Sequence, residues 1–445
     1  MSPDSGASRP LAPGLSAPGP STAGPSVAAA PGGRTIPSAE APESSTRLRV
    51  EQILAVILLL LIGMRRELAG SVAIADAAAL ISLPITWSAV RRLPRFGPIL
   101  LLALLAGVTG VVLSWIAGTQ YEVSSSLQRA MVASLVAVPA TTAAFVWGAQ
   151  RLGARAALAL GAGMLIDALP LLRTQDNPWK FGIGLAVTLM VLALVDGRRR
   201  IVQLVALAAL SASFLVSDAR SSLGFLVIIA GTVLWQATAA WFRWRLPPAR
   251  QLATAQAAVL GIVGAVAISI VLAVSASGSL GEDAQARTLA QSQGSSNFLL
   301  TARPELGASW ALFMHRPWGY GAGVLPRSED VQVAKNGMAA LGYDPSNGYV
   351  ERFMFGNGFE LHSGLVNVWV AASFPGAALM LLIVGVTLAT MIRDLGDLRV
   401  TPWLFLAGLV VLQNVAVGPW NVLPAYLPFV LGAGVMQAPL RAPTP

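Results

Sequence analysis

The sequence predicts an all-α, polytopic integral membrane protein with about twelve spanning helices, from its composition, its apolar segments and the placement of its arginines. Hydrophobic residues make up 55% of the chain and charged residues only 11%. A soluble domain usually carries about 25% charged residues. Apolar stretches recur along the chain between short polar links, and each is long enough to form a spanning helix of about 17 to 25 residues. This pattern indicates many membrane-crossing helices rather than one soluble core.

The first segment of the chain differs from the rest. Residues 1–47 are rich in proline, serine, glycine and alanine, so they bury too little apolar surface to offset the entropy of ordering. We expect a disordered cytoplasmic tail there. About nine spans are expected within 48–275 and about three within 362–445, the last followed by a short cytoplasmic tail. The individual spans are expected near 50–64, 71–90, 97–118, 130–148, 154–172, 180–195, 201–217, 221–241, 254–275, 363–392, 401–418 and 424–438.

The arginines predict the orientation of these spans. They gather in every second link, at Arg91, Arg92, Arg95, Arg151, Arg155, Arg198, Arg199, Arg200, Arg243, Arg245, Arg250, Arg393 and Arg399. Links rich in arginine usually stay on the cytoplasmic side, so we expect both termini inside, with Arg65 and Arg66 as the main exception. The polar segment 276–361 then forms one large extracytoplasmic loop. Apolar residues at helical spacing over 297–315 predict an interfacial helix within it.

The charge and residue counts narrow the chemistry. The net charge of +9 does not indicate nucleic-acid binding, because the arginines lie in separate links rather than on one face. The chain has no cysteine and only two histidines, so it has no disulfide framework and few ligands for a transition metal. We therefore expect no metal and no cofactor.

Ionisable groups near the membrane are candidates for function, because burying a charge in a bilayer is costly. Arg220 lies in a short outer link, where its planar guanidinium suits a phosphate, although an interfacial arginine paired with Asp218 is the alternative. Arg303 lies in the stretch of the expected interfacial helix, seven residues before Trp310, either as a phosphate ligand or as a solvated loop residue. His362 stands where the loop returns to the membrane. A neutral imidazole there is suited to accept a proton from a hydroxyl, and an ordinary interfacial residue is again the alternative.

Two weaker features complete the set of candidates. Gly319, Gly321 and Gly323 suggest a backbone turn that lets a phosphate or sugar approach, although glycine-rich turns are common in loops. Asp76 and Asp167 lie within expected spans, where each suggests a structural pair with an arginine. The sequence leaves their roles, and that of Asp218, open.

Three stretches in order resemble the O-antigen ligase and polymerase superfamily of bacterial membrane glycosyltransferases. The first is S-D-A-R-S-S-L-G at 217–224, the second joins Arg303 to the P-W-G-Y-G-A-G run at 317–323, and the third runs from H-S at 362–363 to F-P-G at 374–376. The resemblance covers most of residues 50–438. Three positions depart from the family pattern: Ser363 stands for asparagine, Ser373 stands for glycine, and no acidic residue lies near Ala371.

The resemblance implies a GT-C-like fold and a metal-independent, inverting transfer of a glycan. The implied donor is an undecaprenyl-diphosphate-linked glycan, the acceptor is a glycan or lipid hydroxyl, and the reaction takes place at the outer face of the bilayer of the cell inner (cytoplasmic) membrane. His362 would be the catalytic base, while Arg220, Arg303, Gly321 and Gly323 would bind substrate, the arginines stabilising the departing diphosphate. Cell-surface polysaccharide assembly is the implied process, and ligase and polymerase share these motifs.

Two other classes of protein stay open. A polytopic transporter or lipid flippase of the cell envelope also has about twelve spans, and it predicts charges deep within spans and helices broken at mid-membrane. A non-catalytic scaffold for envelope assembly would tolerate the loss of His362. The candidate residues gather at one expected face of the membrane, which favours a surface reaction over passage.

Overall fold

The computed structural model describes residues 41–68, 71–239, 254–258, 261 and 303–437. The chain divides into two units, Met1–Ser45 and Thr46–Pro445, and of the first unit only residues 41–45 are described, as the beginning of a helix. Over the described ranges the regular structure is helical, and strand-like pairing is limited to two isolated bridges, between Glu67 and Ala73 and between Val123 and Val324. The all-α prediction is confirmed.

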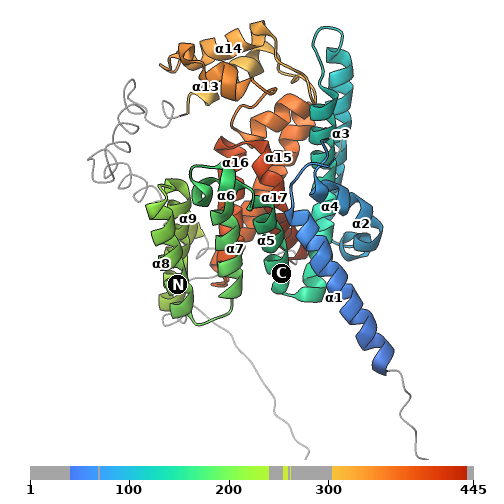
Figure 1. The fold of residues 1–445 in the computed structure, drawn as a ribbon, viewed down its shortest axis with the longest axis vertical. Helices are drawn as coiled ribbons and strands as arrows, with labels where there is room; N and C mark the ends of the chain where they lie inside the picture. Colours follow the sequence, from blue (N-terminus) through green and yellow to red (C-terminus); the bar gives the residue numbers. More distant parts are fainter. Residues whose placement is uncertain (1–40, 69–70, 240–253, 259–260, 262–302, 438–445) are drawn as a thin grey trace, which may run out of the picture. The chain divides into compact units, whose positions relative to one another are not determined.

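The apolar segments form the helices of the larger unit (Figure 1). The α-helices, in chain order, are α1 (Ala41–Gly63), α2 (Ile74–Val90), α3 (Phe96–Ala117), α4 (Ser125–Leu152), α5 (Arg155–Ala168), α6 (Leu171–Thr174), α7 (Gly184–Leu194), α8 (Arg200–Val216), α9 (Arg220–Ala239), α13 (Glu305–His315), α14 (Ser328–Ala339), α15 (Gly364–Gly396), α16 (Pro402–Val417) and α17 (Leu423–Met436). Short helical turns are η1 (Trp179–Ile183), η3 (Pro345–Asn347), η4 (Val350–Met354) and η5 (Trp420–Val422).

Several of these helices have the length and composition of membrane spans. Within the described ranges, five are long and apolar enough to cross a bilayer, namely Phe96–Ala117, Ser125–Leu152, Arg155–Thr174, Arg220–Ala239 and Gly364–Gly396. Five shorter apolar helices are Ile74–Val90, Trp179–Leu194, Arg200–Val216, Pro402–Val417 and Trp420–Met436. Large apolar side chains such as Trp115 on α3 and Val216 on α8 are exposed, as expected for helices that face lipid. A multi-pass membrane protein is consistent with these helices, and the number of about twelve spans stays a prediction.

Parts of the sequence-based prediction fall outside the described residues. They are most of the tail at 1–47, most of the expected span at 254–275, and the loop residues 276–302. Helix α1 begins at Ala41, within the expected tail. The expected interfacial helix is described from Glu305 and ends at His315, as α13.

Small residues allow the helices to approach closely. Gly63 on α1 and Gly163 on α5 face each other, and a Cβ atom on either residue would collide with the backbone of the other helix. Such glycine contacts are typical of helix pairs in membranes, where close packing rather than apolar burial holds helices together. This contact fixes the end of α1, and therefore the link from α1 to α2.

The loop is attached to the membrane helices through the segment 316–325, which we call the glycine segment. The amide of Ala322 donates to the carbonyl of Gly110 on α3 at 3.1 Å, and the hydroxyl of Ser114 donates to the carbonyl of Ala322 at 2.6 Å. The amide of Tyr320 donates to the carbonyl of Val370 on α15 at 2.8 Å. The glycine segment thus joins α3 to α15.

Helix α15 is broken at the same place. Ala372 has φ −139° and ψ 16°, and Ser373 has φ 56°, so the helical hydrogen-bond ladder is interrupted there. The carbonyl of Val370 accepts hydrogen bonds from the amides of Tyr320 and Gly321 instead. The break therefore provides the acceptor that holds the glycine segment.

Helices α13 and α14 pack against each other at one end of α15 and α3 (Figure 1). Gly307 and Gly337 meet at their crossing, where a Cβ atom on either would collide with the carbonyl of the other. An adjoining face of α13 exposes Leu306, Trp310 and Met314, which lie four residues apart and so on one side of the helix. This apolar face suits a helix at a membrane surface.

Candidate functional site

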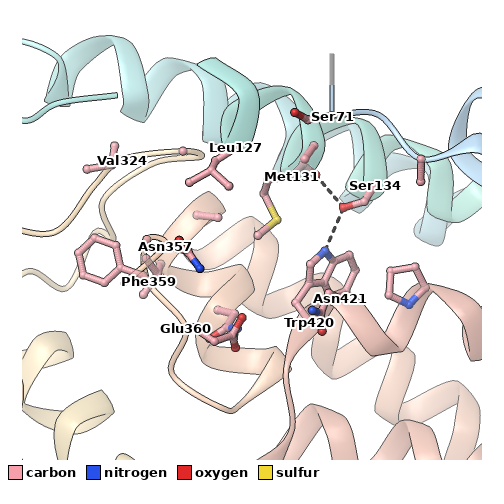
Figure 2. Close-up of a pocket in the computed structure, with 18 of the residues that line it drawn as sticks. Ser71, Leu127, Met131, Ser134, Val324, Asn357, Phe359, Glu360, Trp420 and Asn421 are labelled. Atoms are coloured by element: carbon pink, nitrogen blue, oxygen red, sulfur yellow. Dashed lines mark hydrogen bonds between the residues drawn. The ribbon is translucent and has the colours of Figure 1, made fainter. Parts of the chain in front are cut away.

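A cavity of about 350 Å³ lies among segments that are far apart in the sequence (Figure 2). Its walls come from the link between α1 and α2, the first turns of α4, the glycine segment, the residues before α15, α15 itself, and the beginning of η5 and α17. All the links among these were expected on the outer face. The lining residues are Arg65, Glu67, Ser71, Ala73, Asp76, Leu127, Ala130, Met131, Ser134, Gly321, Gly323, Val324, Asn357, Gly358, Phe359, Glu360, Asn367, Val370, Ala371, Trp420, Asn421 and Pro424.

A carboxylate with an unusual environment stands in the cavity wall, that of Glu360 (Figure 2). Burial raises the pKa of Glu360, while a hydrogen bond from Asn367 and the nearby charge of His362 lower it in part. The amide nitrogen of Asn367 donates to Oε1 of Glu360 at 2.6 Å. Glu360 is therefore a half-buried acid that is held in one orientation.

The side chain of Asn367 braces the turn that carries Glu360 and His362. Asn367 is 3% exposed, and its Oδ1 accepts from the amide of Leu361 at 2.8 Å while its Nδ2 holds Glu360. Ser363 caps α15 by accepting from the amide of Val366, and its hydroxyl donates to the carbonyl of Val415 at 3.0 Å. The turn before α15 is thus fixed from two sides.

His362 has a constrained backbone and a constrained ring. Its φ is 51°, a left-handed conformation that is uncommon for a residue other than glycine and is often found at functional sites. Its Nδ1 lies 3.1 Å from the carbonyl oxygen of Glu360. Because a carbonyl only accepts, Nδ1 carries the proton, and in the neutral form of the ring the lone pair is therefore on Nε2. Nε2 makes no hydrogen bond to any described residue.

Tyr349 contacts both His362 and Glu305, and the charge of Arg303 acts on its pKa. The rings of Tyr349 and His362 lie 6.1 Å apart, and the Tyr349 hydroxyl donates to Oε1 of Glu305 at 2.8 Å. Burial and Glu305 raise the pKa of Tyr349, and the positive charge of Arg303 opposes them. Arg303, Glu305, Tyr349 and His362 therefore form one group of neighbours, which lies outside the lining of the cavity.

Arg220 belongs to a second group, at the beginning of α9. Its Nε donates to Oδ1 of Asp218 at 3.2 Å, and Nζ of Lys180 lies 3.7 Å from the other oxygen of Asp218. Asn177 donates to the carbonyl of Ser217 at 2.7 Å and so ties the beginning of η1 to the link that carries Asp218. The pairing of Arg220 with Asp218 that the sequence suggested is present, and this group does not line the cavity.

The predicted glycines do line the cavity, and their backbone explains why they are glycines. Gly321 and Gly323 have φ values of 114° and 75°, which side chains rarely adopt. A Cβ atom on Gly321 would collide with the backbone of α3 at Ser114, and one on Gly323 with the first turn of α4 at Gln128. These glycines let the loop lie against the helices, rather than only opening space for a ligand.

The two aspartates within the expected spans are paired with arginines. Asp76 accepts from Arg65 at 2.6 Å, and the pair is largely buried at the edge of the cavity. Arg66 lies 3.6 Å from Asp167 and also donates to the carbonyl of Ile166 at 3.0 Å. The structural pairing suggested for Asp76 and Asp167 is therefore present, and it neutralises the two arginines that break the charge rule.

Glu360 and Asn367 did not stand out in the sequence as site residues. An acidic residue two positions before the histidine was visible, but nothing in a linear sequence shows that it faces a cavity. The contact of Asn367 with Leu361 and Glu360 depends on the turn at His362, whose left-handed backbone no pattern predicts. Spacing alone offers one signal, because Asn367 lies on the first turn of a helix that begins just after His362.

Among the described residues, no three His, Cys, Asp or Glu side chains gather as a metal site would require.

Comparisons with known proteins identify no relative of this chain. Models of protein families, curated proteins and solved structures contain no match to this chain.

Proposed function

We propose that the chain is a metal-independent, inverting glycosyltransferase, O-antigen ligase-like or polymerase-like, that transfers a glycan from an undecaprenyl-diphosphate donor to an acceptor hydroxyl. The proposal places it in the cytoplasmic membrane, with its site on the extracytoplasmic side. The ten apolar helices described above, with α1 and the expected span at 254–275, would supply about twelve spans in a GT-C-like arrangement. The observation that carries the proposal is the contact between Nδ1 of His362 and the carbonyl of Glu360, whose side chain lines a polar cavity.

The chemistry needs a base for the acceptor hydroxyl. Nδ1 of His362 is held by the carbonyl of Glu360, so the lone pair of Nε2 is available to accept a proton. In the proposed step Nε2 takes the hydroxyl proton, the hydroxyl oxygen forms a bond to the anomeric carbon, and the bond from that carbon to the diphosphate breaks. The electron pair of the broken bond leaves on the diphosphate.

The departing diphosphate needs positive charge nearby. The charge of Arg303 acts on the pKa of Tyr349, whose ring contacts that of His362, and Arg220 lies with Lys180 around Asp218. Guanidinium groups form paired hydrogen bonds with phosphate oxygens, and such contacts stabilise charge as it develops in a transition state. Arg220 and Arg303 are therefore the proposed donor ligands.

Two observations support a transferase over a transporter. A transporter would use its broken helix to bind a substrate at mid-membrane, whereas the carbonyl freed at the break of α15 is occupied by the amides of Tyr320 and Gly321. The aspartates within helices, Asp76 and Asp167, are neutralised by arginines. The groups that a transport pathway would use thus have structural partners.

Replacing His362 with alanine tests the proposed base. In cells that carry only His362→Ala, we expect transfer to fall by about 100- to 10,000-fold, the usual contribution of a general base. Mass spectrometry would show the undecaprenyl-diphosphate-linked glycan accumulating while one surface polymer is lost. His315→Ala is the matched control, because His315 is the other histidine and lies at the end of α13. Full transfer by a correctly inserted His362→Ala protein would contradict the assignment.

Arg220→Lys tests the phosphate clamp without removing the charge. Lysine lacks the planar fork of arginine, so we expect binding of undecaprenyl diphosphate to the purified protein in nanodiscs to weaken by about tenfold, the equivalent of roughly 1.4 kcal/mol. Arg200→Lys, on α8, is the control and should bind as the unchanged protein does. Unchanged binding in Arg220→Lys would rule out the clamp.

A further inference from the structure

We propose that the 350 Å³ cavity binds a neutral or amine-bearing sugar ring of the acceptor and excludes the diphosphate of the donor. The acceptor role rests on the proposed function. The binding preference itself follows from the charge, the hydrogen-bonding groups and the apolar walls of the cavity.

The charge of the lining disfavours an anion. Its ionisable side chains are three carboxylates, on Glu67, Asp76 and Glu360, and a single guanidinium, on Arg65. Asp76 already occupies that guanidinium through an ion pair of 2.6 Å. A phosphate or uronate in this space would meet Glu360 and Glu67 without a free cation among the lining residues. The cations proposed for the donor, Arg220 and Arg303, lie outside the lining.

The uncharged polar groups suit hydroxyls. The side chains of Asn357 and Asn421 lie in the cavity wall and are exposed (Figure 2). Each amide offers a donor and an acceptor, and Glu360 offers acceptor oxygens. A sugar hydroxyl both donates and accepts, so neighbouring hydroxyls on one ring match this combination of amide and carboxylate groups.

Apolar side chains form the remaining walls. Leu127 and Met131 of α4, Val324 of the glycine segment and Phe359 face the same space in Figure 2. The C–H faces of a sugar ring are apolar, so a ring can place those faces against such walls while its hydroxyls meet the polar groups. A volume of about 350 Å³ falls at the lower end of small-molecule sites, about 300 to 1,000 Å³. It suits a short saccharide rather than a lipid tail.

The cavity and the proposed base share one residue. Glu360 presents its carboxylate to the cavity, and its backbone carbonyl holds Nδ1 of His362 at 3.1 Å. A sugar bound against Glu360 would therefore lie next to the turn that carries the base. This arrangement makes Glu360 a substrate-binding residue that also positions His362.

The test measures binding of simple glycosides to the full chain in nanodiscs, by saturation-transfer NMR. The neutral probes are the methyl glycosides of glucose, galactose and mannose. The methyl glycosides of glucosamine and glucuronic acid add an amine and a carboxylate, respectively, to the glucose configuration. We expect saturable binding of neutral or amine-bearing probes and at least about tenfold weaker binding of the glucuronide. Asn421→Ala should weaken the neutral probes about fivefold, the value of one hydrogen bond. Glu360→Gln should narrow the gap between glucuronide and glucoside.

Asn336→Ala is the matched control, because Asn336 lies on α14 and outside the lining. The proposal would be overturned by a glucuronide that binds as tightly as the glucoside, by no saturable binding of any neutral or amine-bearing probe, or by equal effects of Asn336→Ala and Asn421→Ala. Binding of the probes does not require glycan transfer. If His362→Ala were fully active, the proposed catalytic base would be wrong, but the measured binding preference of the cavity would still hold. In a working transfer assay, Asn421→Ala should raise KM for the acceptor and leave KM for the donor unchanged.

Discussion

Among the individual residues, His362 has a left-handed backbone conformation that its neighbours hold in place. A non-glycine residue at a φ of 51° costs about 1 to 3 kcal/mol of strain. Asn367 on one side and Ser363 on the other fix the turn, so these hydrogen bonds offset the strain, while the carbonyl of Glu360 holds Nδ1 of the ring. Ser373 has a similar φ of 56°, and the family that the sequence resembles has glycine at this position, where glycine adopts such a backbone more easily.

The raised pKa of Glu360 predicts a pH dependence of stability. Burial raises this pKa above its ordinary value of 4.5, so the folded state binds a proton more readily than the unfolded state. Stability should therefore fall as pH rises from 4.5 through the raised pKa, and be lowest above it. In Glu360→Gln this component disappears, and we expect a higher melting temperature than the unchanged protein at pH 8, with a smaller difference at pH 5.

The other ionisable groups of the cavity lining and its neighbourhood are Arg65, Glu67, Asp76 and His362. They are present in both the unchanged protein and Glu360→Gln, so they do not cause the difference between the two. Glu351→Gln is the control with the opposite sign, because a hydrogen bond from Lys335 lowers the pKa of Glu351. Thermal melts of the detergent-solubilised proteins at both pH values would measure the effect. An unchanged pH profile in Glu360→Gln would show that Glu360 ionises alike in the folded and unfolded states.

Sequence reasoning can single out candidate residues, but it does not show which of them contact one another. Arg303 and His362 were expected in one site, and in the structure the ring of His362 contacts Tyr349, whose pKa the charge of Arg303 lowers. Arg220 was expected beside them, but its described contacts are with Asp218 in another group. Charge type and position in a link are visible in a sequence. The partner of each charge depends on how helices pack, which no single-sequence pattern contains.

Among the helices, α13 and α14 cross at a point that depends on two glycines. We expect Gly307→Ala to separate these helices, because the new Cβ atom would collide with the carbonyl of Gly337. Limited proteolysis should then cut α14 and the residues after it faster, while the membrane helices stay protected. Gly231→Ala is the control, because no atom lies near its Cβ position on α9 and alanine favours a helix. Equal protease resistance of Gly307→Ala and the unchanged protein would contradict the expected collision.

The more apolar a helix is, the more closely its predicted bounds agree with the structure. The ends of α2, α3 and α16 lie close to the expected spans, because a long apolar run between charged links has few other outcomes in a membrane. Helix α14 was missed, since its sequence S-E-D-V-Q-V-A-K-N-G-M-A is polar and its helical form depends on packing against α13. The break within α15 was also missed, although Pro375, whose nitrogen cannot donate to the preceding turn, lies just after it.

At the scale of the whole molecule, the arginine pattern predicts which ends of the helices face outward. The chain has no cysteine, so single cysteines can be labelled without removing others. We expect Asn347→Cys, in the large loop, to react with a membrane-impermeant maleimide in intact spheroplasts. Gln150→Cys, at the end of α4, should react only after the membrane is permeabilised. Both residues are exposed, so burial does not decide the result. Labelling of both cysteines in intact spheroplasts would contradict the predicted orientation.

The general arrangement followed from composition, while the cavity did not. The links expected on the outer face meet around the cavity, and the side of the membrane on which they lie stays a prediction. The cavity, however, needs the glycine segment to lie against α3 and α15, and this depends on the φ values of Gly321 and Ser373 together. Such matched conformations, far apart in the chain, have no signature in composition or hydropathy.

The ion pairs of Arg65 and Arg66 have a consequence for how the chain enters the membrane. Arg65 meets Asp76 on the next helix, but Arg66 meets Asp167 on α5, which emerges from the ribosome only after α2, α3 and α4. Until then, Arg66 at the end of α1 lacks that partner and should tend to stay on the cytoplasmic side. We therefore expect α1 to reach its final orientation late in synthesis, when α5 arrives.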